Sequence, residues 1–196
     1  MLTKFKDKFN DFFLILAKPI IRSKVPPNIV TVAGFLFSLC FLFLSLTKPP
    51  LYDVFLLVTF SLSAIMDGID GAIARLTKKA SPKGAFFDSV TDRIVDSIYV
   101  FSLFSLGIFT IEEMFVLLVG NLMISYTRAR AESLGLSLAS VGIAERAERI
   151  IITLVILLSY IFQLPDIVIL AFKMVYMGIV YVTLLQRIYY SMKHLK

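Results

Sequence analysis

Long apolar runs fill most of the chain after its first two dozen residues. They lie at about 28–47, 51–75, 84–108, 110–133, 145–163 and 166–191. Each run is long enough for a helix that crosses a bilayer core of about 30 Å. Proline and glycine mark several of the boundaries, at Pro49–Pro50, Ser81–Pro82, Gly135 and Pro165. The pattern predicts an all-α integral membrane protein, with a core of six transmembrane helices over residues 28–191.

The first 24 residues follow a different pattern. Their apolar side chains recur at helical spacing, and their lysines fall mostly on other faces. The apolar members are Phe5, Phe9, Phe12, Phe13, Leu16 and Ile20. This pattern predicts an N-terminal amphipathic helix over 1–24 that lies in the membrane interface. Two prolines in Val25–Asn28 should end it, which leaves Asn28 as the expected cap of the next helix.

The charges between the apolar runs predict an orientation. With a cytoplasmic N-terminus, the segments facing the cytoplasm hold nearly all of the Lys and Arg residues, whereas the outer loops offer only Lys48. Lys and Arg prefer the cytoplasmic side of membrane proteins. We therefore expect a multi-pass protein of the cell membrane with both termini in the cytoplasm. We also expect a single domain over 1–196, since no repeat or second soluble region is visible.

Composition narrows the possible classes of protein. The chain has 196 residues, of which 58% are hydrophobic, and its mean hydropathy is +0.86. Soluble domains have about 45–50% apolar residues, so a soluble enzyme, a disordered tail and a disulfide scaffold are all disfavoured. The net charge is +6, and most of the basic residues lie in the predicted cytoplasmic segments. It indicates a membrane anchor combined with a site for anionic substrates, and no nucleic-acid partner is expected.

Four aspartates stand out near the second and third runs. Asp67 and Asp70 are three residues apart, and Asp88 and Asp92 are four apart, so each pair shares one helix face. A short link between the runs favours antiparallel helices, in which all four carboxylates converge. Membrane carboxylates are costly unless paired or solvated. Clustered hard oxygen ligands suit Mg²⁺ or Mn²⁺, and two divalent ions would cancel the four charges.

A structural alternative exists for this cluster. Nearby basic side chains offer ion pairs that would neutralise the carboxylates at the interface, namely Arg75, Lys78, Lys79, Lys83 and Arg93. A zinc site is disfavoured, because the only histidine is His194 at the end of the chain.

The spacing around these aspartates resembles a known family. The pattern Asp67-x2-Asp70-Gly71-x2-Ala74-Arg75-x8-Gly84-x3-Asp88-x3-Asp92 is similar, at every position, to the signature of the CDP-alcohol phosphotransferases, membrane enzymes of phospholipid synthesis. The resemblance implies a homodimer of six-span subunits, each preceded by an interfacial helix. It also implies a reaction in which an alcohol attacks the β-phosphorus of CDP-diacylglycerol or CDP-archaeol and CMP leaves.

The same resemblance implies roles for individual residues. The metal ligands would be Asp67, Asp70, Asp88 and Asp92, and Asp92 would also deprotonate the acceptor hydroxyl. The CDP-lipid would be bound by Asp67 and Asp70 together with Gly71, Ala74, Arg75 and Gly84. The short motif Pro27-Asn28-x2-Thr31 resembles a family feature that faces the nucleotide, so Asn28 and Thr31 join this set.

Arginines near the last cytoplasmic loop bear on the acceptor. Arg128, Arg130, Arg146 and Arg149 flank this loop, and four arginines are more than a neutral acceptor would require, so we expect a phosphorylated polyol. The alternative is that they mark the cytoplasmic boundary of the membrane or pair with Glu132, Glu145 and Glu148. The surrounding segments resemble the inositol-phosphate branch of the family, the archaetidylinositol-phosphate and phosphatidylinositol-phosphate synthases. This resemblance implies that Arg128, Arg146 and Arg149 bind the acceptor phosphate, and it favours inositol 1-phosphate as acceptor, although a Lys is frequent in bacterial members where Arg128 stands.

Two other functions compete with this interpretation. A phosphatidylglycerophosphate synthase would use glycerol 3-phosphate at the same arginines. A metal or proton transporter would also place carboxylates within the membrane, but these aspartates gather at one side instead of lining a path through the middle.

Overall fold

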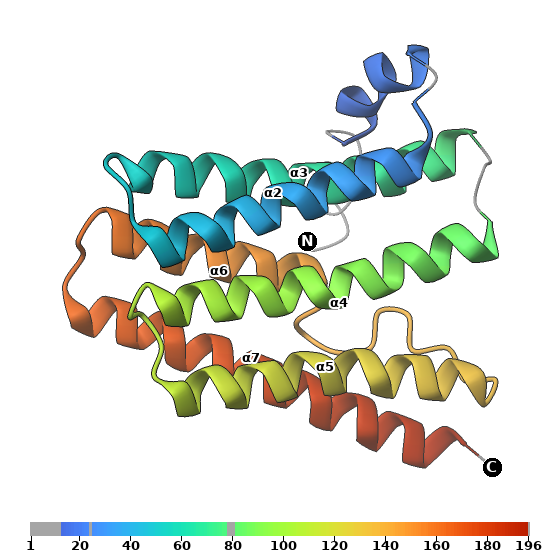
Figure 1. The fold of residues 1–196 in the computed structure, drawn as a ribbon. Helices are drawn as coiled ribbons and strands as arrows, with labels where there is room; N and C mark the ends of the chain where they lie inside the picture. Colours follow the sequence, from blue (N-terminus) through green and yellow to red (C-terminus); the bar gives the residue numbers. More distant parts are fainter. Residues whose placement is uncertain (1–12, 24, 78–80, 196) are drawn as a thin grey trace. The chain divides into compact units, whose positions relative to one another are not determined.

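The computed structural model describes residues 13–23, 25–77 and 81–195, with the side chains of Ala74 and Arg75 left out. Within these ranges the chain is helical and contains no strand, which confirms the all-α prediction. Residues 13–22 form a short helix. The longer helices are α2 (Pro27–Thr47), α3 (Tyr52–Thr77), α4 (Pro82–Ser105), α5 (Ile111–Ser133), α6 (Arg146–Ile161) and α7 (Asp166–His194), as labelled in Figure 1.

Three of the described helices are long and apolar enough to cross a bilayer. They are α2, residues Tyr52–Ile73 of α3, and α7. Charged side chains such as Asp88 and Arg128 dilute the hydropathy of α4 and α5, and α6 has only 16 residues. The six predicted runs therefore each correspond to a helix, but six membrane spans remain a prediction.

The start of α2 differs from the expectation. Pro26 is the extended N-cap residue and makes no side-chain capping bond, while Pro27 is the first helical residue. Asn28 therefore lies inside the first turn, and its predicted role as the cap was wrong. The reason is that proline suits the first helical position, where its fixed φ fits and its missing N–H has no partner to lose.

The chain forms two compact units, Met1–Ile98 and Tyr99–Lys196, and the boundary falls within α4. In the first unit, α2 and α3 run antiparallel and side by side (Figure 1). Ser63 donates a hydrogen bond of 2.8 Å to the backbone oxygen of Gly34. A Cβ on Gly34 would lie 3.1 Å from that of Met66. Glycine at this position therefore allows the two helices to approach closely.

The short helix 13–22 packs on the same helix pair. Its residue Ala17 is fully buried in a cluster with Val30, Ile69, Ala72 and Ile73. The ring of Phe13 occupies the space that a side chain at position 68 would need, so a larger residue than Gly68 would have to displace that ring. Residues 1–12 and Lys24 lie outside the described part of the chain, and the interfacial position of segment 1–24 remains a prediction.

In the second unit, α7 packs against α5 and α6. Several buried polar groups join these elements. Asn121 of α5 donates to the hydroxyl of Tyr176 in α7 at 3.2 Å. The hydroxyl of Thr183 accepts a bond of 3.0 Å from the backbone N–H of Ala144, in the loop before α6. These bonds tie the loop and α5 to α7.

The close approach of α2 and α3 gives a stability prediction. We expect Gly34→Val to destabilise the fold by about 1–3 kcal/mol, the usual cost of overpacking, because the new side chain would push against Met66. Gly178→Val in α7 is the matched control, since no described atom lies within 4 Å of a Cβ there. Thermal unfolding of the two variants in the same detergent would compare them. Equal midpoints would contradict the expectation.

Candidate active site

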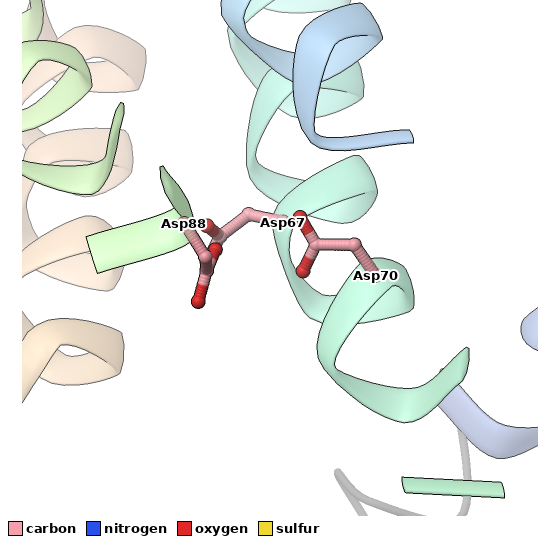
Figure 2. A group of neighbouring side chains, drawn as sticks. All are labelled: Asp67, Asp70 and Asp88. Atoms are coloured by element: carbon pink, nitrogen blue, oxygen red, sulfur yellow. The ribbon is translucent and has the colours of Figure 1, made fainter. Parts of the chain in front are cut away.

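Three of the predicted aspartates come together in the first unit. Asp67 and Asp70 project from α3 and Asp88 from the first turns of α4, and Figure 2 shows their carboxylates facing a common space. One oxygen from each residue lies within 4.8 Å of the other two. The spacing of three residues puts Asp67 and Asp70 on one face of α3, and three of the four carboxylates that were predicted to converge lie together.

The surroundings of this group differ from one member to the next. Asp70 is only 4% exposed, and the hydroxyl of Thr31 donates a hydrogen bond of 2.6 Å to its Oδ2. Asp67 and Asp88 are half-buried. Three carboxylates this close repel one another, and a divalent cation between them would relieve the repulsion. Hard oxygen ligands in a compact group fit Mg²⁺ or Mn²⁺, so the residues present suit the predicted metal.

The fourth predicted ligand, Asp92, does not belong to this group of mutually close oxygens. It lies one helical turn after Asp88 on α4, and its Oδ2 is 3.6 Å from the guanidinium of Arg93. Arg93 also donates to the backbone oxygen of Ser89 at 2.6 Å. The roles of Asp92 as ligand and base therefore remain predictions. Lys78, Lys79 and the side chain of Arg75, which the ion-pair alternative needs, lie outside the described residues.

A cleft of about 320 Å³ opens beside Asp70 and Asp88. It contains four of the residues predicted to face the nucleotide, which are Asn28, Thr31, Gly71 and Gly84. The remaining walls come from Pro26, Pro27, Ser81 and Ala85. The predicted contacts of Ala74 and Arg75 cannot be placed, because their side chains lie outside the described part of the chain.

Gly84 shapes one wall of this cleft. Its backbone N–H donates to the hydroxyl of Ser81 at 3.0 Å, which satisfies one of the unpaired donors at the start of α4. A Cβ at position 84 would lie 3.1 Å from that hydroxyl and 3.5 Å from the side-chain oxygen of Asn28. The glycine thus keeps bare backbone between Ser81 and Asn28, where a ligand can approach.

The predicted acceptor arginines lie in the second unit. Arg128 is exposed and pairs with Glu132 at 2.9 Å, which matches the ion-pair alternative for this residue. Arg146 is the first residue of α6 and is half-buried. Arg149 is 5% exposed, and its guanidinium donates to the backbone oxygen of Ala144 at 3.4 Å.

One further basic residue was not singled out by the sequence pattern. Arg187 of α7 is only 4% exposed and donates to the backbone oxygens of Val141 and Ile124 at 2.9 and 2.8 Å. Ile124 lies one turn before Arg128 on α5, and Val141 lies in the loop that precedes the helix of Arg149. The sequence did offer a signal for this residue. Arg187 lies inside the apolar run at 166–191, whereas a basic residue that marks the membrane boundary lies beyond the end of such a run.

Comparisons with known proteins agree with this site. Residues 24–186 match the model of the CDP-alcohol phosphatidyltransferase family, and this range includes residues of both units. The chain is 33% identical over 201 residues to an archaetidylinositol phosphate synthase from Pyrococcus horikoshii, covering 100% of this chain and 99% of the relative.

Solved structures are similar as well. The phosphatidylinositol phosphate synthase of Mycobacterium tuberculosis with CDP-DAG bound has a TM-score of 0.74 and 26% identity, over 91% of this chain and 92% of that chain. The same enzyme in complex with manganese and citrate has a TM-score of 0.75 and 25% identity, over 92% and 88%. From its aspartate signature and these matches together, the chain belongs to the CDP-alcohol phosphatidyltransferase family.

Proposed function

We propose that this membrane enzyme transfers the phosphatidyl or archaetidyl group of a CDP-linked lipid to inositol 1-phosphate and releases CMP. The observation that carries the proposal is the group of three carboxylates beside the cleft, built from the residues of the family signature. The full-length similarity to an archaetidylinositol phosphate synthase supports inositol phosphate over glycerol 3-phosphate as the acceptor. Family membership also disfavours the transporter alternative.

Under this proposal, the residues of the first unit hold the donor. Asp67, Asp70 and Asp88 would bind Mg²⁺ or Mn²⁺, which neutralises charge on the phosphate oxygens during phosphoryl transfer. Gly71 and Gly84 would let the cytidine nucleotide lie against bare backbone in the cleft. The manganese and the CDP-DAG in the solved relatives support this assignment of metal and donor.

The transfer itself forms one bond and breaks one. The acceptor hydroxyl oxygen bonds to the β-phosphorus of the CDP-lipid, and the bond from that phosphorus to the oxygen bridging to the α-phosphate breaks. CMP leaves with the bonding electrons. We assign Asp92 as the carboxylate that takes the hydroxyl proton, because it lies one turn beyond Asp88 on the same helix face.

The arginines of the second unit would bind the phosphate that the acceptor already carries. Arg128, Arg146 and Arg149 are the predicted members, and we add Arg187 because Arg128 and Arg149 lie near it. Hydrogen bonds from guanidinium groups to phosphate are strong and often bidentate, so several arginines suit a phosphorylated acceptor better than free inositol.

We further propose that the enzyme lies in the cell membrane as a homodimer, with both termini and the active site on the cytoplasmic side. The excess of Lys and Arg in the predicted cytoplasmic segments supports the orientation. The six spans come from the apolar runs and agree with the family resemblance, which also implies the homodimer.

The metal site gives the first functional prediction. Asp88→Asn should lower CMP release from a CDP-linked lipid by about a hundredfold to a thousandfold, since Asp88 would hold the ion that neutralises the reacting phosphate and loss of one electrostatic contribution of this kind costs about 10²–10³ in rate. The measurement uses vesicles with Mg²⁺ and inositol 1-phosphate. Asp166→Asn, at the exposed start of α7, should behave like the wild type. An Asp88→Asn variant with wild-type turnover would rule out the proposed site.

The second functional prediction concerns the acceptor. Among inositol 1-phosphate, free inositol and glycerol 3-phosphate, we expect the highest kcat/KM with inositol 1-phosphate. Arg146→Gln should raise the KM for inositol 1-phosphate about tenfold or more, the cost of losing a hydrogen bond to a charged group, and leave the KM for the CDP-lipid unchanged.

Arg130→Gln is the matched control for the acceptor prediction. Arg130 is exposed on α5, near Ser133 of the same helix, and we expect its replacement to leave both KM values as they are. If free inositol were used as well as inositol 1-phosphate, the proposed phosphate site would be wrong.

A further inference from the structure

We infer that Thr31 of α2 is a positioning residue that orients the carboxylate of Asp70 for binding a divalent ion. The inference rests on the proposed function, because it assumes that Asp67, Asp70 and Asp88 hold such an ion. It changes the role expected for Thr31 from its sequence motif, which was direct contact with the nucleotide. The evidence is a hydrogen bond, the burial of both partners and the packing of the two helices that carry them.

The hydrogen bond between Thr31 and Asp70 joins residues 39 positions apart in the chain. Its length of 2.6 Å is typical of a hydroxyl that donates to an ionised carboxylate, a class about twice as strong as neutral hydrogen bonds. The backbone oxygen of Pro27 lies farther from the same hydroxyl, at 3.3 Å. Since a hydroxyl has one hydrogen, the shorter contact with the charged acceptor takes it.

Burial limits what else Thr31 can contact. Thr31 is 6% exposed and Asp70 is 4% exposed, so the bond between them is shielded from water. Thr31 borders the cleft, but its small exposed surface leaves little of its hydroxyl for a ligand there. A carboxylate has about four lone-pair positions, so Asp70 can accept this bond and still bind a metal ion.

The packing of α2 against α3 holds this hydroxyl in place. One turn beyond Thr31, the backbone oxygen of Gly34 accepts the hydrogen bond of 2.8 Å from Ser63, and α3 lies close to that glycine. This contact fixes the position of α2 along α3. The β-branched side chain of Thr31 also has few rotamers in a helix. Thr31 therefore presents its hydroxyl to Asp70 from a rigid support.

Groups that orient a metal ligand are needed for affinity as well as for rate. Loss of such a group typically costs 10–100-fold in metal affinity. Without the hydroxyl of Thr31, the carboxylate of Asp70 could rotate, and a buried oxygen would lose its partner. Metal affinity should fall even where the fold is intact.

The test measures Mn²⁺ binding to the purified full-length protein by electron paramagnetic resonance, without lipid substrate. We expect Thr31→Val, which keeps the shape and removes the hydroxyl, to raise the Kd for Mn²⁺ about 10–100-fold. Thr31→Ser restores a hydroxyl and should bind Mn²⁺ like the wild type. Thr47→Val is the matched control, because Thr47 is an exposed α2 residue whose hydroxyl donates within its own helix, to Phe43 at 2.9 Å.

The other outcomes are also informative. Wild-type Mn²⁺ affinity in Thr31→Val, with a raised KM for the CDP-lipid, would show a nucleotide contact and overturn the inference. Unchanged binding and unchanged KM would overturn it too. If Thr31→Val did not fold, Thr31→Ala would take its place in the same comparison. If the wild type itself failed to bind Mn²⁺, or Asp70→Asn bound it normally, the proposed metal site would be wrong and the inference would fail with it.

Discussion

The repulsion among three carboxylates at one end of an apolar helix pair is the constraint on which the first unit depends. Asp67, Asp70 and Asp88 have oxygens within 4.8 Å of one another, and Asp70 is almost completely buried. Such a group is unfavourable in an apolar setting unless each oxygen has a partner. The hydroxyl of Thr31 supplies one partner from α2. A divalent cation would supply the second partner, so the cost of the arrangement without metal supports the proposal that these carboxylates bind one.

Near this site, α3 contains glycines that lower its helix propensity but allow close packing. A glycine inside a helix costs about 1 kcal/mol relative to alanine, yet α3 contains Gly68 and Gly71 within the signature region. Gly68 makes room for Phe13, and Gly71 lines the cleft. In the second unit the buried charges are basic instead, and backbone oxygens of Val141 and Ile124 satisfy Arg187. The buried charge therefore has a side-chain hydroxyl as partner in the first unit and backbone oxygens as partners in the second.

The sequence predicted features that depend on local periodicity and failed to predict those that depend on packing. The run at 28–47 became α2 at Pro27–Thr47, because prolines bound the apolar pattern and fix its ends. The spacing of three predicted that Asp67 and Asp70 share a helix face, and Asp88 joins them, but the spacing of four did not bring Asp92 into the same group. The bond from Thr31 to Asp70 could not be predicted, since it depends on how two helices rotate about each other. The same holds for Arg187, whose partners are backbone oxygens distant in the chain.

The position of the cleft bears on how the proposed anionic nucleotide would be bound. Its walls come from the first turns of two helices, with Pro27 and Asn28 at the start of α2 and Gly84 and Ala85 near the start of α4. A helix N-terminus has unpaired N–H groups and a partial positive charge, which attract phosphates. Pro27 lacks an N–H, and the N–H of Gly84 already donates to Ser81, so these donors alone offer little to a diphosphate. Under the proposed function, a metal ion held on the carboxylates would balance most of the charge of the diphosphate, so the orientation of Asp70 would matter for donor binding as well as for transfer.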